Sequence, residues 1–469
     1  MTSSSPAEPL FPSTRRALMH RIAAGQAAGR APSLTGAVVR DGQLAWCGAR
    51  SMLEGHEPDG GTQYRIGSLT KTFVAVMVMR LRDEGRLDLA DPLGKHLDVG
   101  QAGPEALTVA QLLSHTSGLA AEARGPWWER TPGELRPALP DVLGERPQPQ
   151  PAGRVFHYSN PGYALLGALA GQLRGAGWAD VLRREILEPL GMTRTTLQPQ
   201  PPHAGGFAVH PWADVMQPEP AEDTGPMAPA GQLWSTAADL ARFAAFLAGG
   251  DDRVLAAGTL AEMRVPASGP QGDAWDSGYG LGLQLLRAGG RLLSGHSGSM
   301  PGFVCSLWVS PDDGLAGIAL ANATSGPDTN AIAADLIGIV ADREPPLPGR
   351  WAPLPEADPA LLALTGPWYW GPRPYVLRLR AGRVLELSPA GGKGRSSRFR
   401  PEPDGTWTGL DGYYAGETLR VVPGASGPAD HLDLGTFIFT REPYEPSAPE
   451  AARPDPGGWQ GWGPAEPSP

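Results

Sequence analysis

The chain has 469 residues, a formal net charge of −10 at pH 7 and 19% charged residues. This acidic balance excludes proteins that bind nucleic acids or anionic membranes through basic patches, and the length predicts more than one domain. Cys47 and Cys305 are its two cysteines, and its nine histidines show no metal-ligand spacing. We therefore expect no disulfide framework, no metal and no other cofactor.

The amino-terminal segment is predicted to be flexible over residues 1–14 and helical over residues 15–28, where an amphipathic helix packs on the main domain. Arg15 and Arg16 form a pair of the kind found in export signals, but His20 and Arg21 interrupt the apolar stretch that a signal requires. No apolar run reaches the roughly eighteen residues of a membrane span. The sequence therefore predicts a cytoplasmic protein without a membrane segment.

Turn signals and hydrophobic periodicity predict a mixed α/β fold for residues 15–342. A hairpin over residues 36–49 turns at Asp41-Gly42, and a helix over residues 68–84 stops at Gly85. Helices then alternate with proline-rich loops up to residue 250. Strands are predicted over residues 279–287, 291–296, 303–310 and 314–322, followed by a helix over residues 329–341. We expect one antiparallel sheet flanked by helices, a helical subdomain beside it, and a site between the two.

Ser68 and Lys71 open the predicted helix over residues 68–84. Three of the 39 basic residues are lysines, and one of these follows a serine by three positions at the head of a long apolar run. Helix positions i and i+3 share a face, so the amine lies beside the hydroxyl. A buried lysine loses its charge readily, and a neutral amine can take the serine proton to make a nucleophile. Alone, such a pair also arises by chance.

A second motif, Tyr158-Ser159-Asn160, follows in a turn-rich segment before a helical run. A tyrosine there can relay a proton, and an asparagine can hold a substrate amide through its donor and its acceptor. The alternative is a buried tyrosine with a capping asparagine.

The third motif is His296-Ser297-Gly298-Ser299. Small residues around Gly298 let a substrate lie against the backbone, where an N–H group can bind an oxyanion. A rival His-x-Gly at His203 lies in a proline-rich stretch that cannot form an inner strand. A nucleophile elbow over residues 295–299 also fails, because its last position is serine and the only later histidine is the distant His431.

The order S-x-x-K, Y-x-N and H-x-G resembles the serine β-lactamase and penicillin-binding-protein superfamily, in particular its branch of class C β-lactamases, D,D-peptidases and family VIII esterases. The phrases over residues 64–67, 112–119 and 230–240 agree with this resemblance, which covers roughly residues 15–342. It implies a β-lactamase-like fold of the α+β type and a serine hydrolase that works through an acyl-enzyme.

The resemblance also implies roles for these residues. Ser68 is then the acylated nucleophile, and Lys71 and Tyr158 share its proton, with either of the two as general base. Asn160 and His296 bind the substrate, and Gly298 lets it lie against the strand. The backbone N–H groups of Ser68 and Ser299 form the oxyanion hole. Histidine replaces the lysine usual in β-lactamases at position 296, which favours an esterase or a peptidase. No glutamate is identified as a dedicated deacylating base.

Trp127, Trp128 and the loops over residues 120–150 and 198–229 are candidate walls of the cleft.

The remainder of the chain predicts a separate small domain. A proline-rich linker covers residues 343–359, and residues 445–469 form a Pro/Gly/Trp tail. Between them, residues 360–444 alternate short strands with Gly and Asp-Gly turns, which predicts a β-barrel or sandwich similar to the lipocalin-like domains appended to this hydrolase family. The strands are expected over residues 375–380, 384–387, 397–400, 406–410, 418–422 and 431–440.

The sequence thus favours a hydrolase of a small ester, amide or peptide, either an esterase or a D-amino-acid-type peptidase. A D,D-carboxypeptidase or weak β-lactamase is the alternative among enzymes. A non-catalytic ligand-binding or sensor protein on the same fold is the alternative from another class. The oligomeric state and the role of the β-domain stay open.

Overall fold

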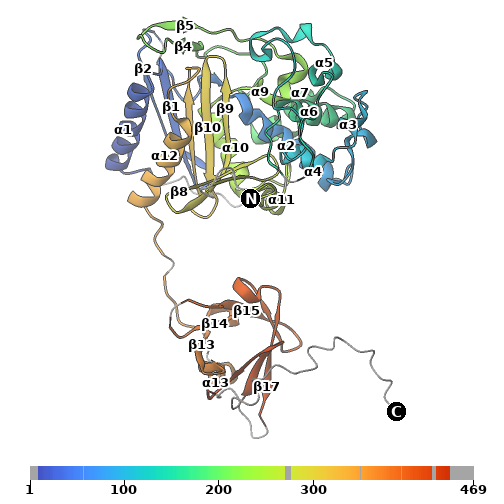
Figure 1. Ribbon diagram of the computed structural model, residues 1–469. Coiled ribbons are helices and arrows are strands. Elements are labelled where there is room, and N and C mark those ends of the chain that lie inside the picture. Colours follow the sequence, from blue (N-terminus) through green and yellow to red (C-terminus); the bar gives the residue numbers. More distant parts are fainter. Residues whose placement is uncertain are drawn as a thin grey trace. The chain divides into compact units, whose positions relative to one another are not determined.

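The structure is a computed structural model that describes residues 9–443 apart from 56, 154, 270–275, 349, 357, 392 and 425–428. It divides into two compact units, Met1–Pro346 and Leu347–Pro469 (Figure 1). The predicted tail over residues 445–469 lies outside the described residues. The sequence led us to expect an antiparallel sheet with flanking helices and an all-β domain after it, and this fold class is confirmed.

The first unit is built on a seven-stranded antiparallel sheet in the order β2-β1-β11-β10-β9-β8-β7. Its strands are β1 (Ser33–Arg40), β2 (Gln43–Ser51), β7 (Ser277–Tyr279), β8 (Gln284–Ala288), β9 (Arg291–Met300), β10 (Phe303–Ser310) and β11 (Leu315–Ala321). Two short ladders lie outside the sheet: β3 (Gln63–Arg65) with β6 (Trp234–Thr236), and β4 (Phe207–Val209) with β5 (Met216–Pro218).

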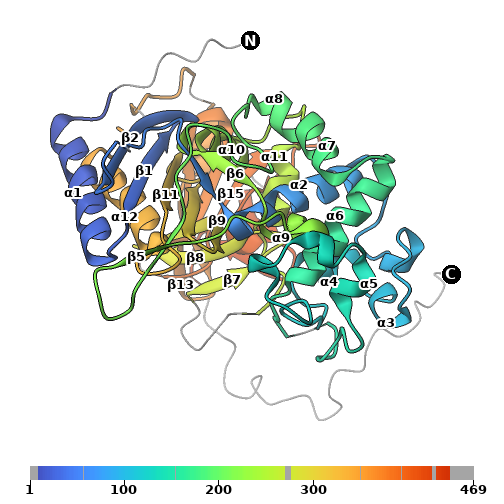
Figure 2. The same cartoon turned by 90° about the horizontal axis from the view of Figure 1, so that it is seen from above.

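The helices of this unit gather on the two faces of the sheet and beside it (Figures 1 and 2). They are α1 (Pro12–Ala28), α2 (Thr70–Asp83), α3 (Ala102–Glu105), α4 (Val109–Leu113), α5 (Leu139–Leu143), α6 (Asn160–Arg174), α7 (Trp178–Leu182), α8 (Glu188–Leu190), α9 (Ala228–Gly231), α10 (Ala237–Gly249), α11 (Ala257–Met263) and α12 (Thr329–Arg343). No helix in the described part of the chain is both long and apolar enough to cross a membrane.

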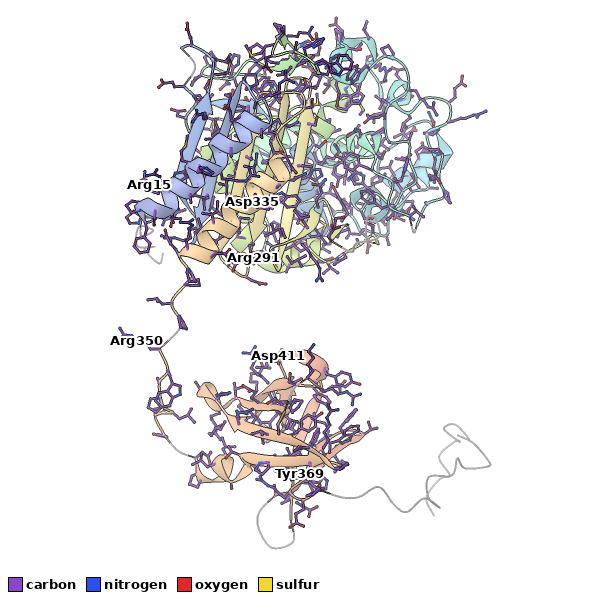
Figure 3. All side chains as sticks on the ribbon, turned by 60° about the vertical axis from the view of Figure 1, so that its left-hand side comes forward. Arg15, Arg291, Asp335, Arg350, Tyr369 and Asp411 are labelled. Atoms are coloured by element: carbon purple, nitrogen blue, oxygen red, sulfur yellow. The ribbon has the colours of Figure 1, made fainter. Side chains whose placement is uncertain are left out.

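α1 and α12 lie side by side over one face of the sheet (Figure 3). Leu18 and Ile22 of α1 and Leu336 of α12 are fully buried in the shared apolar layer, and Arg21 donates to Asp335 at 2.7 Å across the two helices. The predicted start of α1 at residue 15 is wrong: the helix begins at Pro12, because proline fits the first helical turn, and Leu10 is already buried. Residues 9–14 therefore belong to the folded unit.

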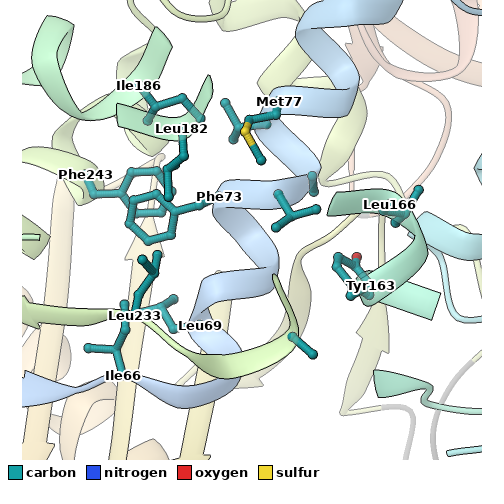
Figure 4. Close-up of a cluster of buried hydrophobic side chains, with 14 of the residues drawn as sticks. Ile66, Leu69, Phe73, Met77, Tyr163, Leu166, Leu182, Ile186, Leu233 and Phe243 are labelled. Carbon is teal, nitrogen blue, oxygen red and sulfur yellow. The ribbon is translucent and has the colours of Figure 1, made fainter. Parts of the chain in front are cut away.

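The main core surrounds α2, the helix that follows Ser68 (Figure 4). Phe73 of α2 stacks on Phe243 of α10 with ring centroids 3.8 Å apart and planes 9° apart. Leu166 and Tyr163 of α6 are buried close to α2 as well. Continuous burial on all sides explains why the sequence of α2 is an unbroken apolar run without a polar stripe.

Two strand predictions in the first unit need correction. The strand expected over residues 279–287 is two strands, β7 and β8, because Gly280 and Gly282 turn the chain between them and Gly282 has φ +77°. The strand expected over residues 291–296 continues to Met300, where Ser299 pairs with Val304 of β10. This longer β9 carries the third motif into the sheet.

The second unit contains a closed barrel of the strands β12 (Gly366–Trp370), β13 (Arg373–Leu379), β14 (Leu385–Pro389), β15 (Ser397–Pro401), β16 (Trp407–Gly409), β17 (Thr418–Pro423), β18 (Ala429–Leu434) and β19 (Phe437–Thr440). β12 was missed, because its Pro and aromatic residues lack a clear alternation. The single strand expected over residues 431–440 is the hairpin β18–β19, which Gly435 turns with φ +72°.

The barrel interior is packed with side chains. Trp368, Leu377, Leu387 and Phe399 are fully buried there. α13 (Pro359–Leu364) adds Leu361 and Leu364 to the same core, and the Trp368 indole donates to the Leu364 carbonyl at 2.8 Å. These side chains form the apolar core of the second unit.

Candidate active site

Ser68 lies at a sharp turn between the ladder strand β3 and helix α2. It is the middle residue of a single 3₁₀ turn, η1 (Gly67–Leu69), and is half-buried. Gly67 before it has φ +49°, and a Cβ at that position would lie only 2.6 Å from the backbone nitrogen of Ser299. Glycine is needed here both for the backbone angle and for this contact. The turn therefore holds the Ser68 peptide against the end of β9.

Lys71 lies one turn further on and is fully buried. Its Nζ donates to Ser68 Oγ at 3.0 Å and to the carbonyl oxygen of Ala230 at 2.6 Å. Burial lowers the pKa of the Lys71 amine to about 7, and the carboxylates of Glu122 and Glu129 oppose this shift. A large fraction of Lys71 is therefore neutral near pH 7 and able to accept the proton of Ser68.

Tyr158 faces the same pair of residues. The Lys71 Nζ lies 4.9 Å from the centroid of its ring, and burial raises the pKa of the Tyr158 phenol while a hydrogen bond to Ser68 opposes the rise. The phenol is thus protonated near neutral pH. Ser68, Lys71 and Tyr158, predicted from motifs ninety residues apart, lie together.

His115 holds the second motif in place, a role that the sequence did not reveal. Its Nδ1 accepts from the Ser159 backbone N–H at 3.0 Å, and its ring centroid lies 4.2 Å from that of Tyr158. Burial keeps the pKa of His115 well below 6.5, so the ring is neutral. The residue has φ +55°, which is rare outside glycine and indicates a fixed position.

Asn160 lies at the first position of α6 and is buried. Its Nδ2 donates to Glu122 Oε1 at 2.8 Å, while its Oδ1 is buried and has no hydrogen-bond partner among the described residues. The Trp128 indole donates to the other oxygen of Glu122 at 2.6 Å. The amide thus offers an acceptor, and Glu122 fixes which way it points.

Glu122 was missed at the sequence level, where no glutamate had a clear role. It lies in the loop over residues 120–150, which was expected to form a wall of the cleft. Its carboxylate is exposed, in contrast to the buried Trp128 that holds it. Glu129 lies nearby, and burial raises the pKa of its carboxyl group, with the charge of Glu122 adding to the rise.

His296 lies on β9, fully buried beside Tyr158, with ring centroids 6.3 Å apart. Its Nδ1 lies 2.5 Å from the Ser297 carbonyl oxygen and its Nε2 3.1 Å from the Tyr279 hydroxyl. Burial and the charge of Lys71 lower the pKa of His296 to about 3. Both ring nitrogens therefore have protein partners, and the neutral ring does not present a charge to a substrate. Its predicted contact with substrate stays a prediction.

The predicted oxyanion strand lies against the Ser68 turn. A Cβ at Gly298 would lie 1.9 Å from the Ile66 carbonyl oxygen, so the two backbones are in direct contact. The buried Cys305 thiol of the neighbouring strand donates to the same carbonyl at 3.2 Å. Ser299 is exposed at this edge, as a residue that contacts substrate would need to be.

The two loops expected to wall the cleft contact each other. The Gly133 N–H donates to the Asp223 carbonyl at 2.8 Å, and Arg130 Nε donates to Glu219 at 3.0 Å. The Arg130 guanidinium also lies 3.7 Å from the ring centroid of the exposed Trp127. In the described part of the chain, no group of three His, Cys, Asp or Glu side chains could hold a metal ion.

The family model described as "Beta-lactamase" matches residues 18–342, and a second model, "Domain of unknown function (DUF7586)", matches residues 357–441. "Penicillin-binding protein 4" of Amycolatopsis lactamdurans is 30% identical over 286 residues, which cover 55% of this chain and 72% of that protein.

Two solved structures extend the likeness. The octameric penicillin-binding protein homologue from Pyrococcus abyssi has a TM-score of 0.62 at 22% identity, and the match covers 90% of this chain and 99% of the homologue. The D-stereospecific amidohydrolase from Streptomyces sp. has a TM-score of 0.57 at 25% identity, and the match covers 72% of this chain and 100% of the amidohydrolase. At 22% identity, the first shows the fold alone.

Proposed function

Because the chain belongs to the beta-lactamase family, we propose that it is a serine hydrolase that forms an acyl-enzyme on Ser68 and cleaves small amides or esters. The observation that carries the proposal is the 3.0 Å contact between Ser68 Oγ and the buried Lys71 amine. A neutral amine at this distance is the activated nucleophile–base pair that acyl transfer requires.

The chemistry follows from the arrangement. Lys71 takes the proton as Ser68 Oγ attacks the substrate carbonyl carbon. The backbone N–H groups of Ser68 and Ser299 bind the resulting oxyanion, because the two peptides lie against each other. As the carbonyl reforms, the leaving amine or alcohol receives the proton through Tyr158. Water then attacks the ester on Ser68, releases the acid and restores the serine.

We further propose that the acyl group carries a free amino group, as in amino-acid amides and short peptides. Asn160 Nδ2 donates to Glu122 Oε1 at 2.8 Å, which places two acceptors, Asn160 Oδ1 and the Glu122 carboxylate, side by side. Asn160 Oδ1 has no hydrogen-bond partner among the described residues. The carboxyl groups of Glu122 and Glu129, whose charges oppose the lowering of the Lys71 pKa, attract an ammonium group in the same way. The likeness to an amidohydrolase described as D-stereospecific supports D-amino acids as substrates.

A D,D-carboxypeptidase or β-lactamase is less well supported, because both act on substrates with a carboxylate. His296 is neutral and its nitrogens have protein partners, so it offers no cation to a carboxylate. Esters of amino acids fit the same acyl site as amides.

A first test is intact-protein mass after treatment with a serine-directed fluorophosphonate, with the Ser68→Ala variant alongside. We expect one adduct on the wild-type protein and none on the variant. No adduct on a folded wild-type protein would support a non-catalytic ligand-binding protein on the same fold.

A second test compares D- and L-alanine p-nitroanilides with their N-acetylated forms, a p-nitrophenyl ester and a chromogenic cephalosporin. We expect the free-amino D-substrate to have the highest kcat/KM, and Glu122→Gln to raise KM for it by about tenfold without affecting the ester. Equal rates for the acetylated and free forms would exclude recognition of the amino group while leaving the hydrolase assignment standing.

A further inference from the structure

The two ends of the carboxy-terminal barrel differ in chemistry. In an up-and-down barrel, alternate connections lie at the same end. The connections over residues 371–372, 390–391 with 393–396, 410–417 and 435–436 therefore share one end, which we call the barrel mouth. α13 lies at the opposite end, where its N-cap Asp358 pairs with Arg383 at 3.1 Å in the connection between β13 and β14.

The barrel mouth contains a hollow of about 720 Å³. Three basic residues line it: Arg373, Lys393 and Arg395. No carboxylate lies within ion-pair distance of any of them in the part of the barrel that the structure describes, although most other arginines of this unit have such a partner. Asp411, labelled in Figure 3, lies in one of the connections that form the mouth but does not line the hollow, and its carboxylate accepts from Arg398 at 2.5 Å.

Aromatic rings hold Arg395 in the mouth. Its guanidinium carbon lies over the Tyr413 ring at 4.3 Å, over the Phe437 ring at 4.5 Å and 5.8 Å from the Trp370 ring centroid. Contacts of this kind use the faces of the planar guanidinium and leave its N–H edge to form a bidentate pair with an oxyanion. Trp370 and Tyr413 line the hollow too and can stack on a flat ligand.

The mouth is built by close packing of its loops. A Cβ at Gly412 would lie 1.9 Å from the Ser396 carbonyl oxygen, and the Tyr414 N–H donates to Ser397 Oγ at 2.9 Å. The Tyr414 ring is buried beneath Phe437 and Tyr413, and its hydroxyl has no hydrogen bond of normal geometry within the described residues. Arg395 lies near this hydroxyl and opposes the effect of burial, which raises the pKa of Tyr414 to about 12.

We propose that the barrel mouth is a second binding site, separate in function from Ser68, for a small molecule that joins an oxyanion to a flat ring. Arg395 binds the phosphate or carboxylate through the N–H groups of its guanidinium, with Lys393 and Arg373 adding positive charge. Trp370 and Tyr413 hold the ring. The ligand lies in the hollow at the mouth, outside the buried apolar core of the barrel.

Calorimetric titration of the full chain tests the site with four probes: phenyl phosphate, phenylacetate, inorganic phosphate and phenol. We expect both ring-bearing anions to bind more tightly than inorganic phosphate or phenol, and the tighter of the two identifies the preferred oxyanion. Arg395→Ala should weaken this binding by about 10- to 100-fold, and added salt should weaken it as well.

Arg420→Ala is the matched control, because Arg420 is an exposed arginine on β17 that does not line the hollow. It should bind like the wild-type protein, and hydrolysis at Ser68 should be unchanged in both variants. Lys393→Ala, at an exposed position, should weaken binding about threefold. This variant replaces Arg395→Ala in the test if the near-UV circular dichroism of Arg395→Ala shows that it does not fold. The proposal is overturned if no probe binds at millimolar concentration, if phenol binds as tightly as phenyl phosphate, or if the mouth variants bind like the control.

Discussion

The amine of Lys71 lies 3.0 Å from Ser68 Oγ and 2.6 Å from the carbonyl oxygen of Ala230. The Ala230 carbonyl can accept a hydrogen bond from the Lys71 amine whether the amine is protonated or neutral, so it fixes the amine without requiring a charge. This second contact directs the remaining lone pair or proton of Lys71 towards the serine. The relationship explains how a fully buried lysine with a pKa of about 7 can serve as the base for Ser68.

Lys71→Arg should reduce acylation of Ser68 by about 10³- to 10⁴-fold, because a guanidinium does not release its proton near neutral pH. The measurement is the rate at which a fluorophosphonate adduct forms, followed by mass. Lys95→Arg is the matched control, since Lys95 is an exposed residue paired with Asp91 at 2.6 Å. Near-normal labelling of Lys71→Arg would refute the base role of Lys71.

Tyr158→Phe should reduce kcat/KM by about 100-fold, less than Lys71→Arg does. Burial raises the pKa of the Tyr158 phenol, so it is protonated in the free protein and acts as a relay. The ring, which packs on His115, is kept in this variant. Steady-state measurement of kcat/KM for the two variants shows which residue is the general base. A larger loss in Tyr158→Phe than in Lys71→Arg would make the tyrosine the base.

Lys71 should make stability depend on pH between about 7 and 10.5, its folded and unfolded pKa values. In this window the unfolded chain binds the proton that the buried amine has lost, so the free energy of unfolding rises with pH. Urea titrations of wild type and Lys71→Met at pH 7, 8 and 9 measure the effect. The difference between them should change by up to about 1.4 kcal/mol per pH unit, in favour of the wild type as pH rises. A constant difference would contradict the lowered pKa.

Gly298→Ala should destabilise the protein by about 1–3 kcal/mol or more and abolish activity, because the new methyl group would lie 1.9 Å from the Ile66 carbonyl and 2.9 Å from Cys305 Sγ. Gly258→Ala is the control: no atom lies within 4 Å of its added Cβ, and helix α11 favours alanine. Thermal unfolding of both variants compares them directly. Equal midpoints would mean that β9 does not press against the Ser68 turn.

The sequence by itself determined the nucleophile motif, the order of the three motifs and the class of the fold. Ser68 and Lys71 are three residues apart on one helix, so local geometry alone brings them together. The turn at Asp41-Gly42 was predictable for the same reason, since Asp41 and Gly42 both have positive φ. Repeated Gly and Asp-Gly turns likewise marked the carboxy-terminal unit as all-β.

Only the tertiary structure decided which groups complete the site. The Ala230 carbonyl is a backbone atom that no residue type reveals, and Glu122 gains its place through contacts with Asn160 and Trp128. The tertiary structure also places His296 beside Tyr279, where both of its ring nitrogens have protein partners. The barrel mouth depends on connections that meet only when the strands close. Contacts between distant segments set burial and pairing, and these in turn set the charge and direction of each group.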